Sequence, residues 1–394
     1  MSSEIKSENF LSKLIAVLRY IWIIIGITLL IFLILDFISG LLMNKIDSVN
    51  LQAKCDEEAK AFNKPEWYEN YFFENEKAMK IRWSPYIYWR RESFEGKNIN
   101  INQKGLRQTW NKDKGDSAPK KIFVFGGSTT WGTGVRDNYT IPSQLSRFIY
   151  DKTKYNVEVT NFGELGFVST QELIALIKEL QLGNVPDIVI FYDGNNDVYA
   201  SYQNGVPGVS HNEFNRIKNF NLENDKSALY KAAIAKAVES SGIYRLIYYL
   251  RGKFFGVHID IPDYTSDRLI DYTLRFYIVN IMIIENLGKL FSFKTLFYWQ
   301  PNVFFKEQLT DVEKNRSAPE LYLKDFYKNT YKQVTLSSYL NNKSNFHNIS
   351  EIFMDDKDTI FIDYCHLNEE GNKVIAERMF NDLKSILDSE NDIK

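Results

Sequence analysis

The sequence of 394 residues is long enough for one large domain with insertions or for two modest domains. Its 48 Lys and Arg against 50 Asp and Glu give a formal net charge of −2, which argues against a nucleic-acid-binding protein because such proteins usually carry a basic excess. The 44% hydrophobic and 25% charged content is that of a globular chain and excludes a largely disordered one. Its 2 cysteines cannot build a disulfide framework, and its 4 histidines leave few candidates for histidine chemistry.

An apolar segment near the N-terminus, residues 20–43, predicts a membrane anchor. At about 1.5 Å per residue it spans roughly 36 Å, more than the ~30 Å hydrocarbon core of a bilayer. Its single charged residue, Asp36, lies toward the far interface, where a carboxylate can reach water. A cleaved signal peptide is the rival interpretation. It needs a shorter apolar core and a small-x-small cleavage site, which Ile38-Ser39-Gly40 matches poorly. We therefore expect a retained anchor.

The charges beside this segment predict its orientation. Three bases precede it, Lys6, Lys13 and Arg19, whereas Lys45 alone follows it closely, before an acidic run at 56–58. The positive-inside bias then places the N-terminus in the cytoplasm. We expect residues 1–19 to form a cytoplasmic tail, residues 20–43 to be the anchor, and the remainder to lie outside, on the periplasmic side of a bacterial inner membrane.

The composition of residues 44–118 predicts a polar juxtamembrane segment with aromatic clusters. The densest cluster lies at residues 83–91. The aromatic and arginine side chains of that cluster suit either an exposed ligand platform or a segment that wraps the main domain, and wrapping is the simpler interpretation. The breaker-rich residues 111–119 predict a domain boundary after this segment.

Short apolar runs predict the strands of a second region, residues 119–388. The predicted strands are 120–127, 157–162, 187–192, 295–299 and 359–363. Helical patterns follow at 170–182 and 369–387, and insertions with helical stretches lie at about 228–250, 266–290 and 302–353. Strands that alternate with helices predict a three-layer α/β/α (flavodoxin-like) domain with a mainly parallel sheet.

The residues that follow the predicted strands carry the groups that an acyl-transfer enzyme needs. In an open α/β sheet a reactive site lies at the carboxyl ends of the strands. Ser128 follows the first predicted strand, Gly166 the second and Asn196 the third. Asp363 and His366 follow the last. Each of these residues alone also suits a turn or a helix cap, and their order at successive strand ends is what favours catalysis.

Each residue has a predicted role in acyl transfer. A serine hydroxyl is a weak nucleophile until a base accepts its proton, so Ser128 is the expected nucleophile and His366 the expected base. Asp363 would orient the imidazole and stabilise the imidazolium. The backbone N–H groups of Ser128 and Gly166 and the side-chain amide of Asn196 would form the oxyanion hole, each worth ~3–4 kcal/mol in the transition state.

This order of residues resembles the four blocks of the SGNH (GDSL-like) hydrolase superfamily over about residues 119–388. Gly127 stands in place of the Asp of Gly-Asp-Ser, and Thr129 in place of Leu, as in the Gly-Gly-Ser-Thr form of bacterial members that modify carbohydrate. Asn161 also fits the second block, and Gly105-Leu106-Arg107 is similar to a Gly-x-Arg stretch of membrane-anchored members. The resemblance implies a serine esterase without cofactor, acting on acylated, most simply O-acetylated, carbohydrate or lipid-linked glycan.

Several alternatives stay open. Water as the acyl acceptor gives an esterase and a sugar hydroxyl gives an O-acyltransferase, because both reactions use the same acyl-serine. A transferase would take its acetyl group from a separate membrane-embedded acyl donor protein. A lipase or thioesterase, and a catalytically inactive binding protein of the same fold, are further alternatives.

Two other kinds of site are not predicted. The glycine-rich run 126–134 has neither Gly-Lys-Ser/Thr nor a Gly-x-Gly-x-x-Gly that opens a helix, so it does not predict a phosphate-binding loop. The histidines are scattered along the chain, so no metal site is expected.

Overall fold

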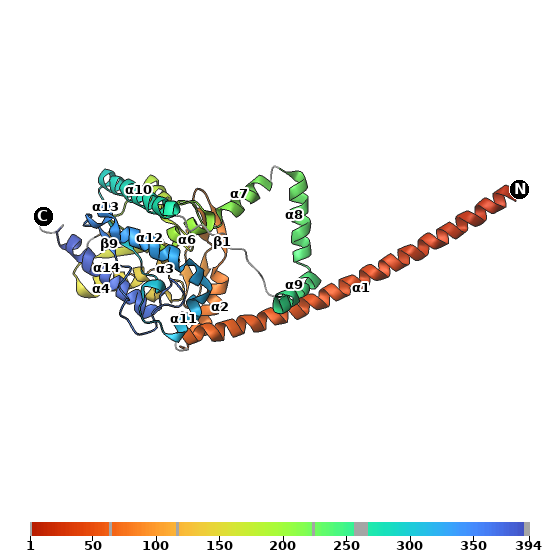
Figure 1. Ribbon diagram of the computed structural model, residues 1–394, viewed down its shortest axis with the longest axis horizontal. Helices are drawn as coiled ribbons and strands as arrows, with labels where there is room; N and C mark the ends of the chain where they lie inside the picture. The colour runs from red at the N-terminus through yellow and green to blue at the C-terminus, as the bar shows by residue number, and fades with distance from the viewer. Residues whose placement is uncertain (1, 63–64, 116–117, 223–224, 256–266, 390–394) are drawn as a thin grey trace. The chain divides into compact units, whose positions relative to one another are not determined.

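The computed structural model describes residues 2–62, 65–115, 118–222, 225–255 and 267–389, and its contacts divide the chain into two compact units (Figure 1). We call residues 55–216 and 262–394 the sheet unit, and residues 1–54 and 217–261 the anchor unit. The two units are described separately below.

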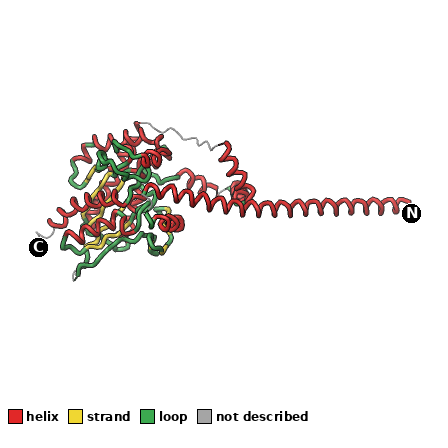
Figure 2. The backbone as a smooth tube through the Cα atoms, turned by 90° about the horizontal axis from the view of Figure 1, so that it is seen from below, coloured by secondary structure: helices red, strands yellow, loops and turns green. Residues whose placement is uncertain are grey.

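A five-stranded parallel sheet forms the centre of the sheet unit (yellow in Figure 2). Its strands, in spatial order, are β6 (Val157–Asn161), β5 (Lys120–Gly126), β7 (Ile188–Asp193), β8 (Lys294–Trp299) and β9 (Phe346–Asn348). Every residue of β7 is buried, as expected for a central strand covered on both faces. In sequence order of its strands this is the 2-1-3-4-5 arrangement of flavodoxin-like folds, which confirms the predicted fold class.

Helices cover both faces of this sheet. α4 (Ile141–Lys152) and α14 (Glu369–Ser389) pack together on one face, and α5 (Ser169–Gln181), α10 (Asp267–Phe291) and α12 (Lys324–Leu336) pack on the other (Figure 1). Shorter helices connect these elements: α3 (Ser128–Trp131), α6 (Asn195–Asn204), α11 (Asp311–Ser317) and α13 (Ser338–Asn341). The predicted three layers are therefore present.

The prediction of a fifth strand at residues 359–363 is wrong. The edge strand is β9, and residues 359–363 contribute only an isolated bridge between Phe361 and Leu367. The reason is that a side chain takes the place of a neighbouring strand: the Glu313 carboxylate accepts the backbone N–H groups of Ile360 (3.0 Å) and Phe361 (3.1 Å). The Asp363 and His366 loop is consequently not a direct extension of the sheet.

The first part of the sheet unit contains α2 (Tyr68–Ala78) and two antiparallel hairpins, β1 (Ile81–Ser84) with β2 (Tyr88–Arg91) and β3 (Phe94–Glu95) with β4 (Asn100–Ile101). The aromatic cluster at residues 83–91 divides between two environments. Trp83 and Tyr86 are exposed, whereas Trp89, Arg90 and Arg91 are buried. Its second half thus packs on the domain, as the wrapping interpretation requires.

The anchor unit contains most of α1 (Ser2–Ala61), together with α8 (Lys226–Glu239) and α9 (Gly242–Phe255); α7 (Glu213–Leu222) crosses the boundary between the units. Among the described residues, α1 is the one helix long and apolar enough to cross a membrane, a property that a signal sequence shares. The predicted helical stretch at 228–250 is two helices, because the chain breaks at Ser240 and Ser241. Cys55 and Cys365 are both buried free thiols.

Candidate active site

Ser128 and His366 meet at the carboxyl end of β5. β5 stops at Gly126, and after Gly127 the chain turns directly into α3, whose first residue is Ser128. The Ser128 Oγ lies 2.6 Å from Nε2 of His366, although the two residues are 238 positions apart in the sequence. This distance is within hydrogen-bond range and suits transfer of the serine proton to the imidazole.

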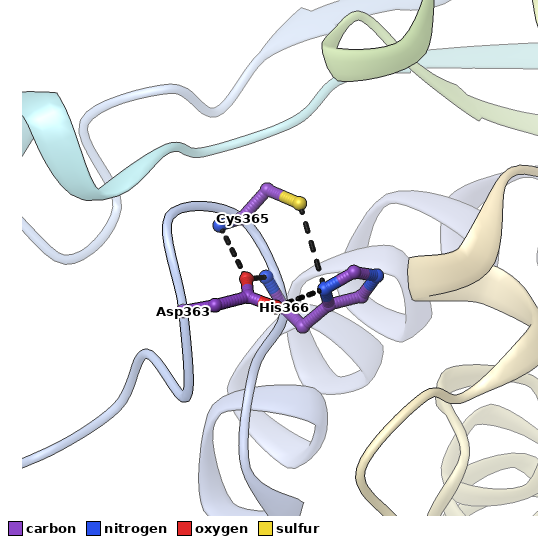
Figure 3. Close-up of side chains that lie close together, drawn as sticks. All are labelled: Asp363, Cys365 and His366. Atoms are coloured by element: carbon purple, nitrogen blue, oxygen red, sulfur yellow. Dashed lines mark hydrogen bonds and ion pairs between the residues drawn. The ribbon is translucent and has the colours of Figure 1, made fainter. Parts of the chain in front are cut away.

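Asp363 holds the other side of the imidazole. Its Oδ2 lies 2.6 Å from Nδ1 of His366, and its Oδ1 accepts the backbone N–H groups of Cys365 (2.9 Å) and His366 (2.8 Å), as Figure 3 shows. Because both carboxylate oxygens are engaged, the loop from Asp363 to His366 fixes the direction of the ring. Nε2 is thereby left pointing at Ser128.

Asp363 and His366 each shift the pKa of the other. Burial by itself would lower the pKa of His366, but the Asp363 carboxylate and the Cys365 thiol together raise that pKa well above 6.5. Burial would raise the pKa of Asp363, but His366 and the two backbone N–H groups lower it below its usual range. The arrangement therefore favours the imidazolium that forms when Ser128 loses its proton.

The three groups predicted for the oxyanion hole come from separate elements. The backbone N–H of Ser128 opens α3, and Gly166 lies in the loop after β6 with φ +72°, a conformation that favours glycine. Asn196 lies in the first turn of α6, where its Nδ2 donates to the carbonyl of Phe167 at 2.8 Å. That bond uses one N–H of the amide and fixes the direction of the other.

The Asn196 amide lies directly against Gly127. A Cβ at position 127 would lie 1.9 Å from the Asn196 Nδ2. The Asn196 amide therefore occupies the space that a side chain at position 127 would need, and the Gly-Gly-Ser form of this loop is coupled to the position of that amide.

We predict that Gly127→Ala displaces the Asn196 amide and lowers kcat for ester hydrolysis by about 10²- to 10³-fold, the usual effect of losing one oxyanion donor. Gly252→Ala is the matched control, because a Cβ at position 252 meets nothing within 4 Å. The measurement is steady-state kinetics of both variants with one ester substrate. An unchanged kcat in Gly127→Ala would contradict a role for Asn196 in the oxyanion hole.

The hairpin of β1 and β2 braces the loop that carries Gly166. Arg91 Nε pairs with Glu164 Oε1 at 3.0 Å, and Trp89 Nε1 donates to the carbonyl of Leu165 at 3.0 Å. Glu164 is fully buried, so burial raises its pKa, against the effect of Arg90 and Arg91. The buried half of the aromatic cluster thus has a positioning role beside the site.

We predict that Arg91→Met costs about 3–5 kcal/mol of unfolding free energy, because it leaves the Glu164 carboxylate buried without its ion-pair partner. Arg91→Met combined with Glu164→Gln should recover most of the loss. Lys152→Met removes the exposed pair with Glu377 and should cost at most about 1 kcal/mol. Urea denaturation of the full chain measures all three, and equal losses from Arg91→Met and Lys152→Met would contradict the prediction.

Two further residues singled out from the sequence hold the other side of the site. Arg107 pairs with Asp137 at 2.8 Å, and its guanidinium donates to the carbonyls of Trp131 (3.2 Å) and Gly132 (2.5 Å) at the end of α3. Asn161 Nδ2 donates to the carbonyl of Thr130 at 3.0 Å. Both residues fix the backbone that follows Ser128.

His211 lies near the site, and nothing in the sequence predicts it there. Its ring lies 3.6 Å from a Cβ built at Gly166 and stacks on Tyr199 with centroids 5.0 Å apart. Burial lowers its pKa to about 4, and its Nε2 has no hydrogen-bond partner among the described residues. It is therefore a neutral imidazole beside the loop that carries Gly166. No neighbouring motif marks it in the sequence.

The ligand atoms of Asp363, Cys365 and His366 lie within 4.8 Å of one another, which makes them the candidate metal group among the described residues. Their contacts fit a proton-transfer site better. His366 uses Nδ1 on Asp363 and Nε2 on Ser128, and burial raises the pKa of the Cys365 thiol, which disfavours the thiolate that a metal needs.

Comparisons with known proteins find similar solved structures only, since no family model and no curated protein matches the chain. A member of the lipolytic protein G-D-S-L family from Veillonella parvula is 14% identical, with 66% of this chain and 97% of that chain covered and a TM-score of 0.36. The acetyl xylan esterase AlAXEase is 16% identical (66% and 98% covered, TM-score 0.36). A catalytic mutant of an acetylxylan esterase from Geobacillus stearothermophilus is 14% identical (68% and 95% covered, TM-score 0.35).

Proposed function

We propose that this chain is a serine esterase that cleaves acyl esters through an acyl-enzyme on Ser128. The observation that supports this most is the continuous chain of contacts from Ser128 Oγ to His366 (2.6 Å) and from His366 to Asp363 (2.6 Å). A serine, a base and a carboxylate that orients the base are the constellation for nucleophilic acyl transfer, whatever fold carries them.

In the proposed acylation step, Ser128 Oγ attacks the ester carbonyl while its proton moves to His366 Nε2. Asp363 stabilises the imidazolium. The negative charge that develops on the carbonyl oxygen is held by the N–H groups of Ser128 and Gly166 and by the Asn196 amide. When the tetrahedral intermediate collapses, His366 returns its proton to the leaving alkoxide, and the acyl group stays on Ser128.

In the proposed deacylation step, His366 takes a proton from the acceptor, which attacks the acyl-serine through a second tetrahedral intermediate in the same oxyanion hole. When this intermediate collapses, its bond to Ser128 Oγ breaks and His366 returns the proton to that oxygen. Water as acceptor releases the acid, and a sugar hydroxyl would instead yield an acylated sugar. The same residues serve either acceptor. We propose hydrolysis as the principal reaction because it requires no separate acyl donor protein.

We propose O-acetylated carbohydrate of the cell envelope, or a lipid-linked glycan, as the substrate. Two features support this choice: the Gly-Gly-Ser-Thr form of the nucleophile loop and the apolar α1, which is a candidate membrane anchor. With the N-terminus in the cytoplasm, the sheet unit would lie on the outer side of the membrane, where envelope glycans are found.

The test uses the full chain in detergent with p-nitrophenyl acetate, with and without a panel of oligosaccharides. Nitrophenol release follows ester cleavage, and mass spectrometry follows the sugars. Release without sugar acetylation supports the esterase, and acetylated sugars that depend on Ser128 would move the proposal to a transferase. No activity above that of Ser128→Ala with acetyl, longer-chain acyl and thioester substrates would favour a non-catalytic protein.

A further inference from the structure

Within the anchor unit, the start of α9 is attached to α1 through a residue that stands out in the sequence, Asp36. The Asp36 Oδ1 accepts hydrogen bonds from Ser241 Oγ (2.6 Å) and from the backbone N–H of Ile243 (3.1 Å). A carboxylate that accepts from these groups caps the N-terminus of a helix. The single charge in the apolar segment thus has a structural partner, which lies 205 positions away in the sequence.

Two further contacts continue along the same face of α1. Gly40 and Gly242 touch through their backbones: a Cβ at position 242 would lie 2.3 Å from the Gly40 nitrogen. Beyond them, Arg245 pairs with Asp47 (2.6 Å) and donates to Asn44 Oδ1 (3.2 Å). Residues 36, 40, 44 and 47 follow one another at helical spacing, so a single stripe of α1 holds α9.

The remaining surface of the helix pair is apolar and exposed. On α8 the exposed stripe at helical spacing is Tyr230, Ile234 and Val238 (71%, 65% and 48% exposed). On α9 it is Tyr244, Ile247 and Tyr248 (38%, 60% and 56% exposed), with the two tyrosine rings stacked. Contiguous exposed apolar stripes of this kind mark a surface that binds a membrane or another protein.

Basic side chains accompany these stripes. The sequences of α8 and α9 together contain six bases, Lys226, Lys231, Lys236, Arg245, Arg251 and Lys253, against the single acid Glu239. Tyr244, Arg245, Tyr248 and Lys253 also line a groove of about 640 Å³, together with Met43 and Asp47 of α1. Tyrosine with arginine or lysine is the combination that places a helix at the level of phospholipid head groups.

We propose that α8 and α9 lie on the outer surface of the bilayer, held there by Asp36, and bind anionic phospholipid head groups. This inference depends on α1 being the proposed membrane anchor. Residues 16–35 would cover about 30 Å of hydrocarbon, with the long Arg19 side chain reaching toward the cytoplasmic surface. Asp36 and the α9 N-terminus then lie together at the outer boundary, which is about two helical turns closer to the N-terminus than the end of the span at 20–43.

The proposal gives the helical insertion between β7 and β8 a function. The insertion begins after α6, whose first turn carries Asn196. The chain is again part of the sheet unit at α10. An insertion that binds lipid would attach the sheet unit to the membrane at a second point in the chain, in addition to α1. A partner protein with an apolar face is the competing occupant, and the experiment below separates the two.

The first test measures lipid contact in the full chain, reconstituted in vesicles of phosphatidylcholine and phosphatidylglycerol. A bimane label is placed in separate variants at Ile247→Cys (α9), Leu30→Cys (α1) and Leu182→Cys, which is 77% exposed on the sheet unit. We expect brominated lipids to quench the label at 247 at least threefold more than the label at 182. The wild-type chain, with both natural cysteines buried, controls for background labelling.

Quenching at position 30 but not at position 247 would overturn the inference and leave the anchor intact, with a protein partner as the remaining occupant. No quenching at position 30 would overturn both the anchor and the inference. Quenching at 247 should fall at least twofold in vesicles of phosphatidylcholine alone. Equal quenching in both lipids would overturn the binding of anionic head groups.

The second test separates attachment to α1 from lipid contact alone. Gly242→Leu inserts a side chain where Asp36 and Gly40 approach, whereas Ser385→Leu places the same side chain on the exposed surface of α14 in the sheet unit. We expect Gly242→Leu to reduce quenching at position 247 at least threefold and Ser385→Leu to leave it unchanged. Equal quenching in the two variants would overturn the role of Asp36 and Gly40 in holding α9.

Discussion

Ser128→Ala should lower kcat for ester hydrolysis by about 10⁴- to 10⁶-fold. The variant removes the oxygen that lies 2.6 Å from His366 Nε2, and no other nucleophile takes its place in the proposed mechanism. The change removes one small polar atom at the start of α3, so the fold should be preserved. Initial rates with p-nitrophenyl acetate, measured beside circular dichroism, test both statements.

The control for this variant is Ser385→Ala, which removes a serine hydroxyl from the exposed surface of α14. It should keep wild-type kcat. If Ser128→Ala kept more than a tenth of the wild-type kcat while folding normally, the nucleophile would have to be a different residue and the proposed mechanism would be wrong.

Asp363→Asn should lower kcat by about 10³- to 10⁴-fold, because an amide cannot stabilise the imidazolium and can hold the ring in the wrong tautomer. It should also change the pH profile. In the wild type the Asp363 carboxylate raises the pKa of His366 well above 6.5. Since His366 must be neutral to accept the serine proton, kcat/KM should rise with pH through that raised pKa.

Loss of the carboxylate charge removes the larger of the two contributions, from Asp363 and Cys365, that raise the pKa of His366, so the acid limb of the Asp363→Asn profile should lie at lower pH than that of the wild type. The profile of kcat/KM against pH for both chains tests the sign of this shift. A shift of the acid limb to higher pH would show that Asp363 does not act on His366 by its charge. A lower kcat without any shift of the acid limb would show the same.

Much of the sheet unit could be predicted from sequence because its central strands are short apolar runs that end at glycine or at a polar turn. β5, β6, β7 and β8 were each predicted to within about two residues, and so were α5, α10 and α14. The positions of Ser128 and Asn196 follow from those strand ends. These parts are local, since the strand and the residue that follows it are neighbours in the chain.

The edge of the sheet could not be predicted in this way. β9 has three residues, Phe346–Asn348, too few for an apolar pattern to be recognised within a helical insertion. Residues 359–363 carry the alternating Ile360 and Ile362 of a strand. Two of their backbone N–H groups nevertheless donate to the carboxylate of Glu313, which itself pairs with Lys306 at 2.8 Å. A side chain that replaces a strand leaves no periodic signal in the sequence.

Contacts between distant segments are the other part that the sequence did not show. The break between α8 and α9 depends on Asp36, and the loop with Gly166 depends on Arg91 and Glu164. Each involves an ordinary charged residue, whose partner is known only once the chain is folded. Gly127 is an intermediate case: the glycine in place of aspartate is visible in the sequence, whereas its close contact with the Asn196 amide is not.

The measurement that tests the proposed function most directly is the location of the acyl group during turnover. The full chain is mixed with p-nitrophenyl acetate, quenched in acid within the first turnovers and digested for peptide mass spectrometry, with Ser128→Ala treated in parallel. We predict one acetyl group on Ser128 in the wild type and none on the corresponding peptide of the variant. Acetylation at another residue, or nitrophenol release that continues unchanged in Ser128→Ala, would contradict an acyl-enzyme on Ser128.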